Sequence, residues 1–378
     1  MKVGIIAYAL EQTAPPSFAS YTLEIALAVR EADKDVEVVL LTTSKKSALD
    51  QRTRFSTHLL PGCRWLPDLM TVGNLAVGIA AHRCNLDIVH DPTGISPFLL
   101  HSPSRGWAAV GTVHDLVSYV YPETHTFLTN FMHRVWLPYA LKQATKVITV
   151  SQHSRDDISR YLGIERTKIA IVPCGVSPRF TPFPEANEAH KLATCYNVHQ
   201  PYILYVGAIT ARKNVVGLLR AFAMLKEQFP NLSLVIAGAP AWKSKSAYQA
   251  LDELQLYSRV ELAGYVADAD LPALYRQAAV FVFPSFYEGF GRPPLEAMAC
   301  GTPVVVSNTS SLPEVVGDAA LLIDPRDVEG LAGAIKTVLA NPDLQQDLVQ
   351  KGKERASLFT WERAGKDIIA VYHQVLER

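Results

Sequence analysis

The sequence contains little that would direct the chain to a nucleic acid, a metal ion or the interior of a membrane. Its 36 Lys and Arg are balanced by 36 Asp and Glu, so no basic excess indicates a nucleic acid partner. No His or Cys pair has the close spacing of a metal site, and no metal is expected. The five cysteines are widely spaced, which is typical of reduced thiols in a cytoplasm rather than of a disulfide framework. No run of about 18 apolar residues exists, so we expect no membrane-spanning segment.

Short apolar runs rich in β-branched residues recur along the 378 residues, with helical patterns between them. Because these runs are continuous rather than alternating, they indicate parallel strands that helices cover on both faces. Strand alternating with helix predicts an α/β fold of right-handed βαβ units and two doubly wound sheets. We interpret the N-terminal residues MKVGIIAYALEQ as a core strand rather than a secretion signal. The runs lie at residues 3–7, 36–41, 87–90, 108–113, 146–150 and 169–172, and at 202–206, 232–237, 260–262, 280–283, 303–306 and 320–323.

A proline-containing, polar stretch at residues 177–199 marks the seam between the two halves. It predicts an N-terminal Rossmann-like domain over 1–185 and a C-terminal Rossmann-like domain over 186–360. Residues 361–376 have the pattern of an amphipathic helix, and we expect the segment 361–378 to pack back on the first domain. Ligands of doubly wound sheets bind outside the carboxyl ends of the strands, so candidate site residues follow each run.

The first candidate segment runs from Glu288 to Glu296, with the sequence EGFGRPPLE, and follows the strand predicted at 280–283. Two carboxylates stand eight residues apart across a Gly-Phe-Gly turn, and glycines let a ligand approach the main chain. A helix is predicted over 294–300, with Pro294 in its first turn and free N–H groups that suit a phosphate. The carboxylates could then accept hydrogen bonds from sugar hydroxyls, one on a hexose and one on a ribose. The alternative is a helix cap with a surface glutamate.

The second candidate segment, GAITARKN at residues 207–214, precedes a helix predicted over 215–229. Arg212 and Lys213 lie at the start of that helix, where the helix dipole disfavours cations. A diphosphate bound between them would remove the conflict, because arginine offers a fork of donors and lysine a point charge. Two solvated surface cations are the alternative. Since both segments follow strands of one predicted sheet, they can face the same ligand.

Further polar residues stand at strand ends and helix starts. His114 and Asp115 follow the fourth predicted strand, where catalytic residues lie in open sheets, although a histidine there can also be structural. Asp268 and Asp270 form an Asp-x-Asp pattern of a kind that holds divalent cations. A metal cage needs more converging oxygens, so we interpret this pattern as the cap of the following helix. Ser151 is interpreted as another helix cap, with a hydroxyl lining a cleft as the alternative.

Six stretches of the sequence carry a family resemblance, and they are YVGAITARKN, FVFPSFYEGFGRPPLEAMACGTPVVVSN, SLPEVVGDAALLIDP, GTVHDL, VSQHSRDDI and VPCGVSPRF. Together they resemble the retaining family 4 glycosyltransferases. The resemblance is strong over 201–330 and weaker over 1–200. Within the family, the chain is most similar to bacterial mannosyltransferases of surface-polysaccharide assembly. The fold implied is GT-B, in which two doubly wound Rossmann-like domains face each other across a cleft.

The resemblance implies a role for each matching residue. Glu288 is expected near the donor hexose and the reaction centre, and Glu296 on the ribose hydroxyls. Arg212 and Lys213 are expected on the donor diphosphate, and His114 is expected to reach the transferred sugar. The catalytic residues implied are therefore His114, Glu288, Arg212 and Lys213. The other donor-binding residues implied are Gly207, Gly289, Phe290, Gly291, Pro294 and, where the family packs the nucleobase, Tyr265 and Val266.

Residues 17–22, with the sequence SFASYT, depart from the glycine-rich loop that the family often has after its first strand. That loop lies close to the donor phosphate and the acceptor, so Ser17, Tyr21 and Asp115 are expected on the acceptor side. Side chains in place of glycines would narrow the cleft, which leaves the type of acceptor open. Ala208 stands where many relatives have arginine, so the basic pair that follows supplies the main cations.

The resemblance implies a hexosyltransferase that moves a sugar from a nucleoside diphosphate sugar to a glycan or lipid-linked saccharide. Retention of configuration and independence of any metal cofactor are implied with it. GDP-mannose is the first donor expected, and a UDP-sugar of glucose or N-acetylglucosamine is the alternative. Other classes are an epimerase or phosphorylase of the same fold, a non-catalytic sugar-nucleotide binder and a dinucleotide-dependent oxidoreductase. The oxidoreductase is disfavoured, because no Gly-x-Gly-x-x-Gly follows the first predicted strand.

One helical pattern suggests where the chain acts. The helix predicted over 127–146 carries Phe131, Trp136 and Tyr139 together with basic side chains. A helix of this composition can lie at a lipid surface, and a core helix with a solvated edge is the alternative. The expected location is the cytoplasm, with peripheral contact on the inner face of the membrane.

Overall fold

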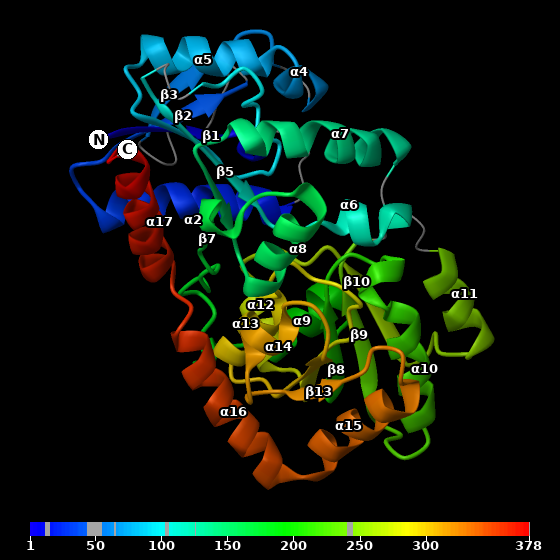
Figure 1. Cartoon of the computed structure of the whole chain (residues 1–378). Helices are drawn as coiled ribbons and strands as arrows, with labels where there is room; N and C mark the ends of the chain where they lie inside the picture. Colours follow the sequence, from blue (N-terminus) through cyan, green and yellow to red (C-terminus); the bar gives the residue numbers. More distant parts are fainter. Residues whose placement is uncertain are drawn as a thin grey trace. The chain divides into compact units, whose positions relative to one another are not determined.

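The chain forms two compact units, each built on one parallel sheet with helices packed against it (Figure 1). The first unit consists of Met1–Val120, Thr126–Gly175 and Trp361–Arg378, and the second of Tyr121–His125 and Val176–Thr360. The two doubly wound sheets predicted from the apolar runs are therefore confirmed. The computed structural model describes residues 1–11, 16–43, 55–63, 66–102, 106–124, 126–239 and 245–377.

The first unit contains a sheet of seven parallel strands, which are β1 (Lys2–Ile6), β2 (Glu37–Thr42), β3 (Ser56–Leu59), β4 (Ile88–Asp91), β5 (Ala108–Val113), β6 (Lys146–Thr149) and β7 (Ile169–Ile171). Their order is β3-β2-β1-β4-β5-β6-β7. All residues of β4, β5 and β6 are buried, as expected for strands covered on both faces. Strand β3 is not among the predicted strands, because its residues STHL are mostly polar and half-buried at the edge of the sheet.

The helices of the first unit follow the strands in the expected alternation. Ser151 accepts a hydrogen bond from the backbone N–H of Ser154 at 3.0 Å, so its predicted role as a helix cap is confirmed. That helix ends at Gly163, whose left-handed φ of 63° favours glycine. The helices are α1 (Tyr8–Glu11), α2 (Pro16–Ala32), α4 (Leu66–Met70), α5 (Gly73–Arg83), α6 (Val117–Val120), α7 (Phe127–Gln143), α8 (Gln152–Leu162) and α17 (Trp361–Leu376), with a 3-10 turn at Arg166–Lys168.

The C-terminal helix α17 packs along α2, as Figure 1 shows for the red and blue helices. It buries the face that carries Trp361, Ile368 and Tyr372, so the predicted amphipathic helix is confirmed with both of its ends. The approach of the two helices is very close at Gly365. A Cβ at this position would lie 2.4 Å from the carbonyl oxygen of Ala28, so only glycine fits there.

The second unit contains six parallel strands, which are β8 (Tyr202–Val206), β9 (Ser233–Ala237), β10 (Val260–Gly264), β11 (Val280–Phe283), β12 (Val304–Ser307) and β13 (Leu321–Ile323). Their order is β10-β9-β8-β11-β12-β13. The first connections run from β8 outward to β10, and the chain then returns to place β11 on the other side of β8. Ligands of doubly wound sheets bind at such a switch point, outside the carboxyl ends of the two central strands.

The helices of the second unit alternate with its strands along the chain. The predicted helices that begin at Val215 and Leu271 are confirmed. The helices are α9 (Glu188–Tyr196), α10 (Val215–Leu225), α11 (Lys245–Glu253), α12 (Leu271–Arg276), α13 (Arg292–Ala299), α14 (Leu312–Val316), α15 (Val328–Ala340) and α16 (Pro342–Ser357), and the 3-10 turns are η2 (Pro122–Thr124) and η4 (Ala211–Lys213).

Candidate active site

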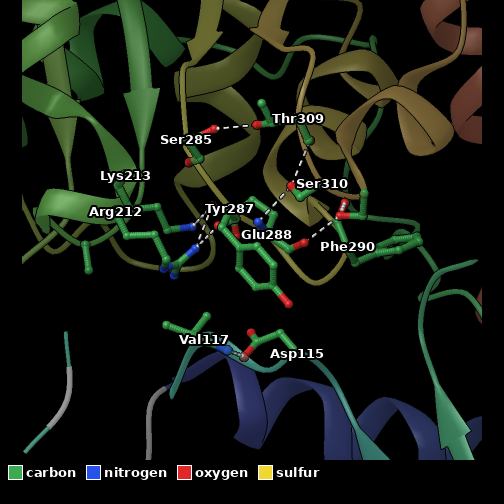
Figure 2. Close-up of polar contacts among 12 residues, drawn as sticks. Asp115, Val117, Arg212, Lys213, Ser285, Tyr287, Glu288, Phe290, Thr309 and Ser310 are labelled. Atoms are coloured by element: carbon green, nitrogen blue, oxygen red, sulfur yellow. Dashed lines mark hydrogen bonds and ion pairs between the residues drawn. The ribbon is translucent and has the colours of Figure 1, made fainter. Parts of the chain in front are cut away.

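The carboxyl ends of β8 and β11 bring the two strongest sequence segments together (Figure 2). Lys213 Nζ lies 2.6 Å from Glu288 Oε1, and Arg212 Nη1 lies 3.1 Å from the same oxygen. Arg212 also donates a hydrogen bond to the carbonyl of Tyr287, and Lys213 Nζ lies 4.6 Å from the centre of the Phe283 ring. One carboxylate oxygen is thus shared by two cations that come from a different strand.

The two cations are held before the first turn of α10 rather than within it. They lie in η4, and Asn214 then takes a left-handed backbone with φ 55°. Its side chain accepts a hydrogen bond from the N–H of Gly217 at 3.2 Å and donates one to the carbonyl of Pro325 at 2.7 Å. The Arg212 and Lys213 side chains are only 16% and 14% exposed, so the alternative of two solvated surface cations is wrong.

Glu288 is a buried carboxylate that stays ionised because of its neighbours. Burial alone would raise its pKa, but the positive charges of Arg212 and Lys213 outweigh burial and lower the pKa below its ordinary value. The unfavourable placement of two cations near a helix start is therefore offset by Glu288 in this structure. A bound diphosphate would compete with Glu288 for the same two cations.

Three residues after β12 fix the loop that carries Glu288, and none of them is among the predicted site residues. Figure 2 labels two of them, Thr309 and Ser310. The Thr309 hydroxyl donates to the carbonyl of Ser285 at 3.2 Å. The backbone N–H of Glu288 donates to Ser310 Oγ at 2.9 Å, and Ser311 Oγ donates to the Glu288 carbonyl at 2.9 Å. Three adjacent hydroxyl residues at 309–311, two residues beyond the strand predicted at 303–306, were a signal in the sequence. These bonds hold the main chain of the loop without using the Glu288 carboxylate.

The glycine turn after Glu288 leads directly into α13. Gly291 has a φ of 110°, and a Cβ there would lie 2.7 Å from a methyl carbon of Leu312. The helix begins at Arg292, two residues before the predicted start at Pro294, because the left-handed glycine already ends the loop. No side chain caps this helix, so the interpretation of the segment as a simple helix cap is wrong.

Glu296 is buried on α13 and has its own partners. Its Oε2 accepts a hydrogen bond from the Tyr275 hydroxyl at 3.1 Å, and its Oε1 lies 3.5 Å from Arg292 Nη2. The alternative of a surface glutamate is therefore wrong for both carboxylates. Tyr275, which comes from α12 and was not a predicted site residue, orients the carboxylate. Glu288 and Glu296 come from one continuous segment, but their carboxylates bind different side chains.

The loop between β10 and α12 carries the two residues expected at a nucleobase. Tyr265 is 65% exposed, whereas Val266 is buried. The backbone N–H of Ala267 donates to the Tyr196 hydroxyl at 3.2 Å, and Tyr196 donates to Asp270 Oδ2 at 2.8 Å. Helix α9 therefore braces this loop and leaves the Tyr265 ring on the surface.

The Asp268-Ala-Asp270 pattern forms ion pairs rather than a cap. Asp270 makes no capping hydrogen bond to α12 and instead binds Lys191 of α9, so its interpretation as a helix cap is wrong. Asp268 Oδ2 lies 3.5 Å from Arg179 Nη1. Both carboxylates join the loop to the segment that precedes β8. The pKa of Asp270 is lowered, first by its hydrogen bond with Lys191.

In the first unit, His114 lies directly after β5, as predicted. Its Nε2 lies 2.8 Å from the carbonyl oxygen of Pro92. Two rings of α2 meet the imidazole edge to face, with centroid distances of 4.4 Å for Tyr21 and 5.2 Å for Phe18. Asp115 accepts a hydrogen bond from the N–H of Val117 at 3.1 Å and so caps α6. The Pro92 carbonyl and the two aromatic rings therefore restrict the imidazole.

The remaining candidate donor-binding residues lie in the loops that follow β8 and β11. Gly207 follows β8 with its backbone N–H donating to the carbonyl of Ala237 at 2.9 Å. Phe290 is buried beside Phe359, with ring centroids 5.7 Å apart, and its carbonyl oxygen lies 2.8 Å from Ser311 Oγ, as an alternative acceptor for that hydroxyl. Gly289 lies between Glu288 and Phe290 in the same turn. The side chain of Ser17 lies outside the described residues.

Comparison with known proteins identifies two family profiles in the chain. "Glycosyl transferases group 1" matches residues 188–355, and "Glycosyltransferase Family 4" matches residues 19–180. The chain is 36% identical to the O-antigen chain mannosyltransferase B of Escherichia coli, over 71% of each chain. It is 29% identical to the MMP alpha-(1->4)-mannosyltransferase of Mycolicibacterium hassiacum, over 79% of this chain and 73% of that protein.

Two solved structures have the same fold at low sequence identity. Sucrose-phosphate synthase from Thermosynechococcus elongatus is 23% identical, with a TM-score of 0.79, and the match covers 100% of this chain and 99% of that one. Anabaena HepE in complex with UDP and glucose is 20% identical, with a TM-score of 0.80 and coverage of 99% and 100%. The sequence relatives and the two parallel sheets agree, and the chain belongs to glycosyltransferase family 4 as a hexosyltransferase of the GT-B fold.

Proposed function

We propose that the chain is a retaining, metal-independent hexosyltransferase whose donor is GDP-mannose and whose acceptor is a glycan or a lipid-linked saccharide. The observation that carries the proposal is the triad of Glu288, Arg212 and Lys213 at the carboxyl ends of β8 and β11. Two largely buried cations at a strand switch point are suited to a diphosphate. The names of the sequence relatives favour mannose as the sugar.

The leaving group in this reaction is a nucleoside diphosphate, and its departure builds negative charge on a phosphate oxygen. Arg212 offers a fork of N–H donors and Lys213 a compact charge, and both are already held in place before the ligand arrives. The N-terminus of α13 adds a positive dipole end and the backbone N–H groups of Arg292 and Leu295, since the two prolines between them have none. Such preorganised charges stabilise the transition state without reorganisation and without a cation from solution.

In the proposed reaction the anomeric carbon keeps its configuration, because the leaving group departs and the acceptor attacks on the same face of the sugar. The bond from the anomeric carbon to the phosphate oxygen breaks, and the acceptor oxygen forms its bond to the same carbon on the same face. The acceptor proton moves to the departing phosphate oxygen, so no side chain acts as nucleophile or base. Glu288 and Glu296 are not an acid and base pair, because Glu296 is bound to Tyr275 and both come from one segment.

Each carboxylate then has a binding role. When the donor diphosphate engages Arg212 and Lys213, the Glu288 carboxylate is released from these cations and can accept hydrogen bonds from hexose hydroxyls. Glu296, oriented by Tyr275, is assigned to the ribose, and the exposed ring of Tyr265 is assigned to the nucleobase. His114 is assigned to the transferred sugar.

The proposal is tested by incubating the protein with GDP-mannose and an extract of lipid-linked or polysaccharide acceptors, with and without EDTA. We expect GDP to be released only when an acceptor is present, an α-mannoside product from the α-linked donor, and rates that EDTA does not change. UDP-glucose is run in parallel, because one solved neighbour of the same fold contains UDP and glucose. Transfer only from UDP-glucose would show that the proposed donor, GDP-mannose, is wrong. Nucleotide release without an acceptor would favour an epimerase or phosphorylase.

We also propose peripheral contact with a membrane through α7. Phe131, Val135 and Tyr139 are 54%, 46% and 63% exposed, and their spacing of four residues places them on one face of the helix. Arg134 and Lys142 are exposed beside them, and the helix sequence contains no acidic residue. An apolar stripe flanked by basic side chains is the composition of a helix at an anionic lipid surface. No described helix is long and apolar enough to cross a bilayer.

This contact is tested by sedimentation with vesicles of phosphatidylglycerol and phosphatidylcholine. We expect the protein to pellet at low salt, and the double variant Phe131→Ser, Tyr139→Ser to remain in the supernatant. The control is Tyr257→Ser, which removes an aromatic ring of similar exposure from the second unit. Equal pelleting of the double variant and the wild type would contradict the role of α7.

A further inference from the structure

The turn that follows β4 is built around a buried carboxylate with unusual partners. Asp91 is completely buried. One oxygen accepts hydrogen bonds from the N–H of Thr93 at 3.0 Å and from its hydroxyl at 2.6 Å, and the other accepts from the N–H of Ser96 at 2.6 Å. Across the described residues, every hydrogen-bond partner of this carboxylate is a neutral group. A buried carboxylate without a cation beside it is costly to the fold, so a role beyond packing is indicated.

Pro92 lies inside this turn, between Asp91 and the residue that binds it. The hydrogen bonds from positions 93 and 96 close the turn around the carboxylate, and Gly94 takes a left-handed φ of 83° within it. The carbonyl oxygen of Pro92 is thereby directed at His114, whose Nε2 lies 2.8 Å away. Because proline fixes its own φ, the direction of this carbonyl depends on few remaining torsions.

A carbonyl oxygen can only accept a hydrogen bond, so the contact with Pro92 requires a proton on His114 Nε2. In the neutral ring, Nδ1 is then the nitrogen that accepts. The rings of Tyr21 and Phe18 meet the imidazole edge to face and restrict its rotation about the side-chain bonds. The ring therefore has one favoured orientation and one favoured tautomer, and both depend on the direction of the Pro92 carbonyl.

We propose that Asp91 is a positioning residue for His114: its buried carboxylate holds the turn after β4 so that the Pro92 carbonyl fixes the orientation and the Nε2–H tautomer of the histidine. The proposal rests on the proposed function, in which His114 reaches the transferred sugar. It assigns a role to a residue that touches neither the donor nor the acceptor. Asparagine at this position would keep the volume, but its amide would face the N–H of Ser96 with a second donor and open the turn.

The first test is the state of the histidine itself, measured in the full-length protein with ¹⁵N-labelled histidine. In the wild type, the two ring nitrogens of His114 should have the shifts of an Nε2–H tautomer. In Asp91→Asn, we expect a mixture of tautomers or exchange-broadened signals. The variant His114→Ala assigns these signals. The control is Thr145→Val, which removes a hydrogen bond of 3.0 Å from the N–H of Ala109, at the other end of β5 in the same unit. It should leave the His114 signals unchanged.

The second test is kinetic. A ring displaced by about 1 Å can cost about 100-fold in rate, so Asp91→Asn should lower kcat by about 10- to 100-fold. The KM for the donor should stay near the wild-type value, because the diphosphate and ribose contacts lie in the second unit. If Asp91→Asn does not fold, Thr93→Val removes only the hydroxyl bond of 2.6 Å and should give the same changes in smaller measure.

The outcomes separate this inference from the proposed function. Unchanged His114 signals and an unchanged kcat in the folded Asp91 or Thr93 variant would overturn the positioning role. Full activity of His114→Ala would overturn the role of the histidine in transfer, whereas the tautomer measurement would still decide whether Asp91 orients it. A rise in donor KM without any change in the His114 signals would also contradict the inference, because it would mean that the turn acts elsewhere.

Discussion

Replacing Glu288 with glutamine separates the two roles that its carboxylate has in this account. In the ligand-free protein, Glu288 pairs with both Arg212 and Lys213 through one oxygen, at 3.1 and 2.6 Å. Glutamine has nearly the same volume and cannot neutralise either cation. We therefore expect the variant to be less stable without ligand, to bind a nucleoside diphosphate more tightly and to transfer sugar more slowly.

The loss of stability can be bounded from the structure. Removing one partner of a buried ion pair costs about 3–5 kcal/mol. The cationic side chains are 16% and 14% exposed, so water screens part of the effect and we expect about 3 kcal/mol. In a domain of roughly 150–250 residues, about 1 kcal/mol lowers Tm by about 2–4 °C. The unfolding transition of the second unit should therefore fall by about 6–12 °C.

The assay is calorimetry of wild type and variant with and without GDP. At a concentration 100 times Kd, the nucleotide should stabilise the wild type by about 2.7 kcal/mol. The variant should gain more at the same concentration, because the diphosphate restores the missing negative charge, and each tenfold increase in affinity adds about 1.4 kcal/mol. Transfer should nevertheless be slower by about tenfold or more, because the contact of Glu288 with the hexose is lost.

The matched control is Glu253→Gln, which removes a carboxylate from the exposed end of α11 and should change neither Tm nor nucleotide binding. Unfolding of Glu288→Gln at the wild-type temperature, with no additional stability from GDP, would contradict this prediction. That result would mean that the two cations do not depend on this carboxylate. Full transfer activity in the variant would refute the second role and leave the first intact.

Three further predictions concern other parts of the chain. Tyr275→Phe removes the hydrogen bond that orients Glu296, and steady-state kinetics should show a donor KM about tenfold higher with little change in kcat. Burial lowers the pKa of His90 to about 3 in the folded protein. Below about pH 6.5 this histidine is protonated in the unfolded chain but not in the folded one, so the free energy of unfolding decreases as the pH drops. In denaturant titrations, the free energy of unfolding of the wild type should fall by about 2 kcal/mol more between pH 6.5 and pH 5 than that of His90→Gln. Equal decreases in the two proteins would contradict the assignment. Gly365→Val should cost about 2–3 kcal/mol in the same titrations, because its Cβ would meet the Ala28 carbonyl.

The sequence predicted most of the strands, because a parallel strand covered on both faces must be apolar along its whole length. The run at 280–283 and strand β11 coincide for this reason. Strand β3, which is not predicted, lies at a sheet edge, where polar side chains are tolerated and the sequence has no continuous apolar run. The predicted start of α13 is two residues late, because Pro294 indicates a first turn whereas Gly291 already ends the loop.

The site could be predicted in part. Glu288, Arg212 and Lys213 follow neighbouring strands, and strand order alone brings such segments together. Ser310 and Tyr275 could not be found in this way, because their contacts depend on the path of loops and on the packing of α12 against α13. Asp270 was misinterpreted as a cap, since a helix-start aspartate has the same local sequence whether its partner is the helix or a distant lysine.

In the proposed function, a nucleoside diphosphate sugar binds at the carboxyl ends of β8 and β11 without a metal ion. Isothermal titration of GDP-mannose, UDP-glucose, GDP and UDP, with and without EDTA, into the wild type and the double variant Arg212→Ala, Lys213→Ala tests it most directly. We predict that one nucleotide family, GDP first, binds the wild type equally with and without EDTA, and that the double variant loses this binding. Binding that EDTA abolishes, or that the double variant retains at wild-type affinity, would contradict the account.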